Sequence, residues 1–158
     1  MTDFSFDIKC SADFFRKLKE DFNDYQEDTT SSRKAINCAM TAWHLSDWIY
    51  NEFINIPSNS FSKLEGFQAD LKRLCPSLQI MHDITNGSKH HTLTRHKTQI
   101  DNTHLHIGPF SKVFSREFDQ TSLDIEMKDG SRKYFEDEIV EVVKFWNDYL
   151  VGRLNIEI

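Results

Sequence analysis

The chain contains little glycine, proline and cysteine, and each shortage excludes a class of protein. Its 158 residues include 5 glycines, 3 prolines and 3 cysteines. No glycine-rich phosphate loop, dinucleotide fingerprint or nucleophile elbow is present. Cys10, Cys38 and Cys75 are odd in number, far apart and never in a C-x-x-C pair, which indicates neither a disulfide framework nor a cysteine zinc site. A reducing cytoplasm is the compartment that fits this cysteine pattern best.

Long apolar runs are also missing from the sequence. The longest apolar stretch, from Ala35 to Ile56, is interrupted by polar residues such as His44 and Asp47, and no basic-then-apolar leader follows Met1. We therefore expect a soluble, unprocessed chain that has no membrane partner.

Large aromatic residues are abundant. Thirteen phenylalanines and three tryptophans are available to a chain of 158 residues. A chain of this length can bury a shared core without disulfide or metal staples, and each buried aromatic removes roughly 150–250 Å² from water. The sequence predicts one domain that covers residues 1–158.

The charge is acidic overall but unevenly distributed. The net charge of −6 argues against a general nucleic-acid binder. Residues 31–116, however, carry ten Lys and Arg against six Asp and Glu, and all seven histidines lie there. If the protein binds an anion, we expect the site in this central part.

Hydrophobic spacing predicts a mainly α protein. Apolar residues at intervals of three and four predict helices over about 13–27, 33–55, 60–74, 76–90 and 137–153. Apolar and polar residues alternate over about 103–135, where Asp129-Gly130 is typical of a hairpin turn. The expected fold class is a helical bundle with a small antiparallel β-sheet or hairpin inserted before the C-terminal helix.

The second predicted helix carries an unusual polar stripe. At about 100° per residue, one narrow face collects Asn37, Thr41, His44, Asp47, Asn51 and Asn55. A solvent-facing stripe on a core helix is one interpretation, but such stripes are usually rich in Glu, Lys and Gln. The other interpretation is a site in which Asp47 orients His44 one turn away and raises its basicity.

The segment "IMHDITNGSKHH", residues 80–91, offers a second polar face. If it is helical throughout, one arc holds His82, Asp83, Asn86, Lys89 and His90. The alternative is that Asn86-Gly87 ends the helix and leaves Ser88 to His91 as a loop.

A metal site is a further possibility for so much histidine. His104 and His106 are expected on the same face of a strand, where they can present two imidazoles to one ion. A third ligand could come from His90, His91, His96 or Asp101. No tight signature such as H-E-x-x-H is present. We therefore expect no cofactor, and name His104 and His106 as the ligands if a metal is bound.

Two short patterns resemble the HEPN superfamily of helical-bundle proteins. They are "AWHLSDW", Ala42 to Trp48, and "DITNGSKH", Asp83 to His90, followed by Arg95; the resemblance covers about residues 33–97. It implies a metal-independent endoribonuclease of the kind found in toxin–antitoxin and phage-defence systems. The family signature is an Arg, an adjacent polar residue and a later His. His90 matches the histidine and Asp83 or Asn86 the polar residue, but no arginine precedes His90 at the expected distance.

The resulting expectation is an RNA- or nucleotide-binding pocket in which His44 and His90 face one cavity. His90 would take the proton from a ribose 2′-hydroxyl, Lys89 would stabilise the phosphate, and Asp47 would hold His44 for the leaving group. Further binding residues are expected to be His82, Asp83, Asn86, Asn51 and Arg95. The resemblance and the aromatic surplus also lead us to expect a homodimer. The alternatives are a noncatalytic partner-binding module and a metal-dependent hydrolase.

Overall fold

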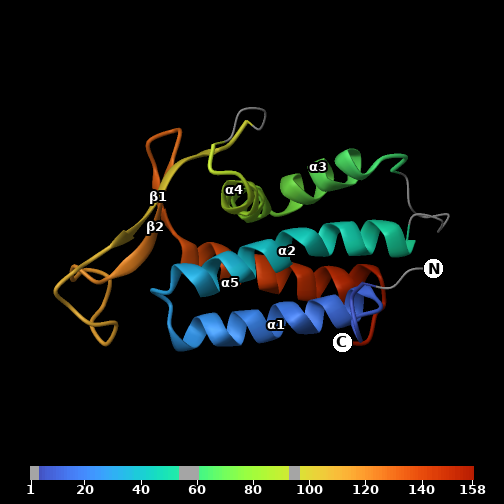
Figure 1. Ribbon diagram of the computed structural model, residues 1–158, viewed down its shortest axis with the longest axis horizontal. Coiled ribbons are helices and arrows are strands. Elements are labelled where there is room, and N and C mark those ends of the chain that lie inside the picture. The colour runs from blue at the N-terminus through green and yellow to red at the C-terminus, as the bar shows by residue number, and fades with distance from the viewer. Residues whose placement is uncertain (1–3, 54–60, 93–96) are drawn as a thin grey trace.

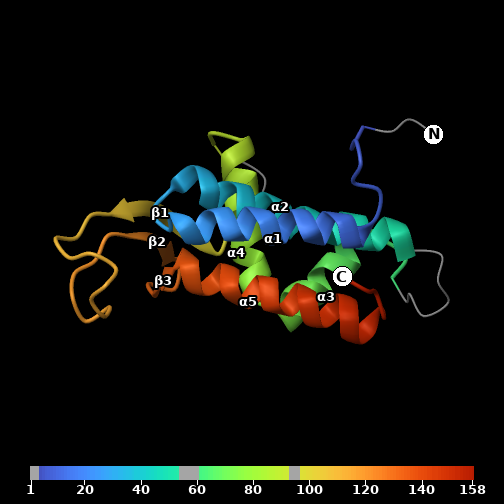
Figure 2. The same cartoon turned by 90° about the horizontal axis from the view of Figure 1, so that it is seen from below.

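Long helices run side by side along the long axis of the molecule, and a small sheet lies at one end (Figure 1). In the computed structural model, which describes residues 4–53, 61–92 and 97–158, the helices are α1 (Ser11–Glu27), α2 (Ser32–Phe53), α3 (Leu64–Leu74), α4 (Ser77–Lys89) and α5 (Phe135–Asp148). Helix α5 continues into a short π-helical turn, η1 (Tyr149–Arg153). Helices α1, α2 and α5 contact one another, and α4 packs across α2 rather than along it (Figures 1 and 2).

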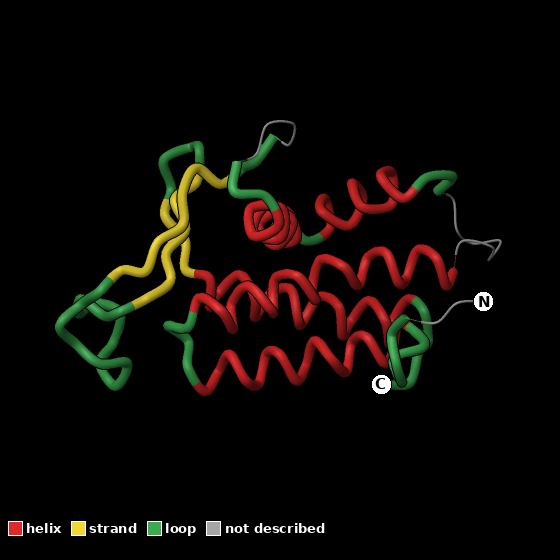
Figure 3. Tube along the Cα trace, viewed as in Figure 1, coloured by secondary structure: helices red, strands yellow, loops and turns green. Residues whose placement is uncertain are grey.

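The sheet consists of β1 (Ile100–His106), β2 (Ser122–Met127) and β3 (Arg132–Tyr134) in the order β1-β2-β3, with both pairs antiparallel. Figure 3 shows it at one end of the helical layer, immediately before α5. The expected fold class, mainly α with a small antiparallel sheet before the C-terminal helix, is confirmed.

The predicted hairpin turn is also confirmed. Gly130 adopts φ +85°, which a residue with a side chain rarely adopts, and its N–H donates to the carbonyl of Met127 over 2.9 Å. The carboxylate of Asp129 accepts a hydrogen bond from the backbone N–H of Ser131 over 2.8 Å. These contacts join β2 to β3.

The third helix starts later than its apolar spacing predicts. The prediction of 60–74 is wrong over Phe61 to Lys63: the helix begins at Leu64, because Lys63 is extended at φ −139° and ψ 147°. Phe61 still packs edge-on against Phe67, with ring centroids 5.7 Å apart, from the segment before the helix. Phe61 therefore packs at the spacing expected of a helix, although its own backbone is not helical. Ser60 lies outside the described residues.

The fourth helix does not end at Asn86-Gly87, which was one of the two alternatives that the sequence left open. Helix α4 continues through Asn86 and Gly87 to Lys89, and the N–H of His90 closes it on the carbonyl of Asn86 over 3.0 Å. The polar residues of this segment thus share a helix as far as Lys89, and His90 caps its end. The second helix is described as far as Phe53, and the closing helix begins at Phe135, two residues earlier than predicted.

All the helices and the two longer strands contribute to one hydrophobic core. It contains Phe15 from α1, Leu45 from α2, Leu71 from α3, Met81 from α4 and Trp146 from α5, among others. The indole Nε1 of Trp146 donates to the backbone carbonyl of Ala42 over 2.9 Å and ties α5 to α2 inside this core. Of the helices in the described ranges, none combines the length and the apolar character that crossing a bilayer requires.

Candidate functional site

The two sequence motifs meet where α4 crosses α2. The imidazole of His82 on α4 is stacked on the indole of Trp43 on α2, with ring centroids 4.1 Å apart and an interplanar angle of 17°. Trp43 is buried and His82 is half-buried. The stacking holds the plane of the imidazole against the indole.

Both nitrogens of His82 have polar partners. Nδ1 lies 2.7 Å from Nζ of Lys72 on α3, and Nε2 lies 2.9 Å from Nδ2 of Asn86. An ammonium can only donate, so Nδ1 accepts, and a neutral ring then has its proton on Nε2. With that tautomer the side-chain amide of Asn86 is turned by 180°, so that its oxygen takes the place of Nδ2 and accepts from Nε2–H. Lys72, His82 and Asn86 form a hydrogen-bonded chain.

Lys72 is held in a partly desolvated position. Its ammonium lies 4.8 Å from the centroid of the Trp43 ring, which is a cation–π contact. Burial lowers the pKa of Lys72, and the negative charge of Asp83 opposes that shift. The chain therefore contains a cation that has given up part of its hydration.

His44, one residue after Trp43, is half-buried, and charges on two other helices act on it. Burial lowers the pKa of His44 below its ordinary value of 6.5; Asp47 raises it, and the charges of Lys17 on α1 and Lys89 on α4 lower it further. Burial in turn raises the pKa of Asp47, and His44 opposes that shift. His44 is consequently neutral near pH 7 and able to accept a proton.

We call the polar residues at this crossing the α2–α4 strip. The strip consists of His44, Asp47, Lys72, His82, Asn86 and Lys89. Its members on α4 extend to Lys89, one turn beyond Asn86, and its members on α2 are His44 and Asp47; α2 packs against α4, and the charge of Lys89 lowers the pKa of His44. The strip thus combines five residues predicted from the two motifs with Lys72.

Three other residues predicted for the site, Asn51, His90 and Arg95, are not part of the strip. The amide of Asn51 donates to the backbone carbonyl of Asp47 over 2.9 Å, within its own helix. His90 is exposed at the end of α4, and a single cavity that faces both His44 and His90 stays a prediction. Arg95 lies outside the described residues.

Asp83 has a role inside the fold. It is buried, with 3% of its surface exposed, and its Oδ2 accepts from the backbone N–H groups of Gln99 and Ile100 over 2.7 and 3.2 Å. Its Oδ1 accepts from the amide of Gln79 over 2.8 Å. This carboxylate fixes the start of β1 against α4, and we therefore leave it out of the strip.

Lys72 could not be predicted as a site residue, because nothing in its local sequence distinguishes it from other lysines. It is one of two basic residues in the last turn of α3, ten positions before His82. A basic residue at a helix C-terminus is ordinary, because it complements the helix dipole. Only the packing of α3 and α4 brings it to the imidazole.

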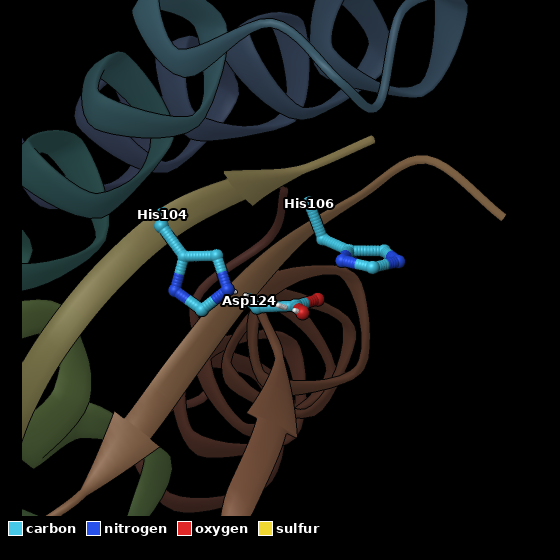
Figure 4. A group of neighbouring side chains, drawn as sticks. All are labelled: His104, His106 and Asp124. Carbon is cyan, nitrogen blue, oxygen red and sulfur yellow. Dashed lines mark ion pairs between the residues drawn. The ribbon is translucent and has the colours of Figure 1, made fainter. Parts of the chain in front are cut away.

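A second group of polar residues lies on the sheet. His104 and His106 on β1 and Asp124 on β2 each offer one metal-ligating atom, and these atoms lie within 4.8 Å of one another (Figure 4). The first two are the residues that the sequence named for a metal. Beside them lies a cavity of about 200 Å³, whose lining includes Asp119, Ser122 and Arg132.

Comparison with known proteins gives no relative: no protein-family model matches the chain, and neither the curated proteins nor the solved structures contain a significant match.

Proposed function

We propose that this protein is an HEPN-like RNA- or nucleotide-binding protein that cleaves RNA without a metal ion at the α2–α4 strip. One observation carries the proposal: the half-buried His44 is on α2, which packs against α4, and the charge of Lys89 on α4 acts on its imidazole. A cation and a neutral imidazole are what binding a phosphodiester and deprotonating a neighbouring hydroxyl require. Lys89 is the cation that we assign to the phosphate, because Lys17 is already paired with Asp21 over 2.6 Å.

The lowered pKa of His44 leads us to exchange the roles expected of His44 and His90. A histidine whose pKa is lowered is a better base than acid near pH 7, so we assign proton abstraction from the ribose 2′-hydroxyl to His44. The 2′-oxygen then attacks phosphorus, a 2′,3′-cyclic phosphate forms, and the departing 5′-oxygen takes a proton from the exposed His90. Lys89 stabilises the charge that builds on the phosphate.

The hydrogen-bonded chain of Lys72, His82 and Asn86 supplies a second group of contacts. Its charged member, Lys72, is partly dehydrated, which strengthens its attraction for a phosphate oxygen. Because the chain fixes the α4 side of the strip, we assign it a positioning role. The resemblance to HEPN proteins implies an activity used in toxin or phage-defence systems.

RNA binding tests the proposal first. Titration of fluorescently labelled single-stranded RNA, followed by anisotropy in EDTA, should give a dissociation constant that rises several-fold in Lys89→Ala. Lys144→Ala is the matched control, because Lys144 is an exposed lysine on α5. Equal weakening by both variants would indicate non-specific charge attraction and would contradict the assignment.

A noncatalytic partner-binding module is the second candidate, and a surface feature favours it. The loop 107–121 holds three phenylalanine rings, Phe110, Phe114 and Phe118, whose centroids lie 5.1 to 5.4 Å apart. All three are exposed, and Ile107 and Val113 in the same loop are 77% and 92% exposed. Exposed apolar clusters of this kind are typical of protein interfaces.

The homodimer expected from the sequence remains a proposal and would use such a surface. Light scattering at tens of micromolar should give a dimer mass for the wild type and a lower mass for Phe114→Ser. A monomer at that concentration would contradict the dimer, and capture of a different protein would favour the partner-binding module.

A further inference from the structure

A buried carboxylate on the sheet lies between two imidazoles. The side chain of Asp124 is 0% exposed, and among the described residues its Oδ2 has an ion pair with Arg132 but no partner with the geometry of a hydrogen bond. Strand pairing places His104 directly opposite Asp124, and His106 lies two residues further along the same face. A buried acceptor without a well-formed hydrogen bond is uncommon and requires a reason.

Figure 4 shows the two imidazoles on either side of the Asp124 carboxylate. The Nε2 of His104 lies 3.7 Å from Asp124 Oδ2. The histidines themselves are only partly covered, with 39% and 31% of their side chains exposed. The buried acid is thus fixed, whereas the two histidines can adjust their positions.

Each of the three groups has a second partner that orients it. The Nδ1 of His104 lies 3.7 Å from a carboxylate oxygen of Glu126, and the Nε2 of His106 contacts the carboxylate of Asp119. The Oδ1 of Asp124 accepts a hydrogen bond from Ser122 Oγ over 2.7 Å. Outer carboxylates and hydroxyls that hold ligands in this way accompany most histidine-ligated metals.

We propose that His104 Nε2, His106 Nδ1 and Asp124 Oδ2 bind a zinc-type divalent cation, with water as the fourth ligand. Two imidazoles and one carboxylate form a typical ligand set for such an ion. Ligand atoms about 2.0–2.1 Å from a tetrahedral zinc ion are about 3.3 Å apart. The present separations, up to 4.8 Å, need a modest contraction that rotation of the exposed histidines can supply.

Arg132 on β3 is the group that opposes a cation here. Its guanidinium forms an ion pair with Asp124 Oδ2, although no N–H meets the geometry of a hydrogen bond. Arg132 is 48% exposed and its guanidinium also lies 5.3 Å from the ring centroid of Tyr134. Metal binding therefore requires Arg132 to move away from Asp124.

This inference does not depend on the proposed function, because the sheet residues and the α2–α4 strip share no side chain. The ion would link β1 to β2 at the base of the loop 107–121. That loop already begins at a close crossing, where a Cβ on Gly108 would lie 2.1 Å from the backbone oxygen of Asp119.

Metal titration of the full chain tests the proposal. After EDTA treatment and desalting, calorimetric titration with Zn²⁺ should give one site with micromolar or tighter affinity. His104→Ala and His106→Ala should each weaken binding by at least about tenfold. His91→Ala is the matched control, because His91 is an exposed histidine outside the cluster, and should bind Zn²⁺ as the wild type does. The absorption spectrum of bound Co²⁺ should be that of a tetrahedral ion.

Two further measurements keep the test decisive. Circular dichroism checks that the histidine variants are folded. We expect both variants to fold, because the side chains of His104 and His106 are partly exposed. Arg132→Gln should bind Zn²⁺ at least as tightly as the wild type, because it removes the competing charge. Failure of the wild type to bind Zn²⁺, wild-type affinity in both histidine variants, or loss of affinity in Arg132→Gln would overturn the proposal. RNA binding by His104→Ala should equal that of the wild type, which separates this site from the strip.

Discussion

The imidazole of His82 lies flat against the indole of Trp43, with ring centroids 4.1 Å apart, and this contact joins the two helices that carry the sequence motifs. The stacked pair is also held from the sides by Lys72 and Asn86. This contact therefore helps to hold α4 against α2, and its contribution to stability can be measured.

Replacement of His82 by alanine should reduce the free energy of unfolding by about 1–3 kcal/mol. The change removes the stacking on Trp43 and leaves the half-buried Lys72 and Asn86 without their shared partner. Urea denaturation measures the effect, with the exposed His91→Ala as control. A His82→Ala variant as stable as His91→Ala would show that the hydrogen-bonded chain contributes little.

Replacement of Asp83 by alanine should destabilise the junction between α4 and β1. Its carboxylate accepts two backbone N–H groups, those of Gln99 and Ile100, in a buried position. Without it these donors lose their partner, at a cost of about 1–3 kcal/mol each, so hydrogen exchange at Gln99 and Ile100 should accelerate. Exchange at wild-type rates would contradict the anchoring role of Asp83.

The pKa of His44 should change when its charged neighbours are replaced. NMR of its ring protons should give a pKa below 6.5, since burial outweighs the attraction of Asp47. Lys89→Ala should raise this pKa and Asp47→Asn should lower it, because each removes one of the charges that act on the ring. No change in Lys89→Ala would mean that the end of α4 does not belong to the same site as His44.

The same shift predicts how stability depends on pH. Because the folded pKa of His44 lies below the unfolded value, the unfolded chain binds more protons between the two values, and stability rises with pH there. The contribution of His44 is complete above the unfolded pKa of about 6.5 and is lost as pH falls toward the folded pKa. Thermal melts across this range should show a smaller loss for His44→Gln than for the wild type. An equal loss in both would contradict a neutral, buried His44.

Much of the fold could be predicted from the sequence because local rules determine it. Apolar spacing located the helices, and Asp129-Gly130 located the β2–β3 turn through the positive φ that Gly130 permits. Phe61 shows the limit of spacing, because it reaches the core from non-helical backbone.

The candidate sites were less predictable because they depend on packing between distant segments. His44, Asp47, His82, Asn86 and Lys89 came from two local motifs, whereas Lys72 joins them only through the packing of α3 against α4. Asp124 comes opposite His104 through the β1–β2 register, which the long loop 107–121 leaves undetermined in the sequence. Asp83 has the residue type and spacing of a site residue. It is buried, however, and its carboxylate holds the backbone of β1 against α4.

Cleavage of mixed-sequence single-stranded RNA in EDTA tests the central claim most directly. The wild type should cleave it and produce 2′,3′-cyclic phosphate ends, and His44→Ala should lose at least about 100-fold in rate, because a general base typically contributes 10²–10⁴-fold. His91→Ala should cleave at the wild-type rate, and melting curves should confirm that both variants are folded. Absence of cleavage by the wild type in EDTA, or undiminished cleavage by His44→Ala, would contradict a metal-independent ribonuclease at the α2–α4 strip.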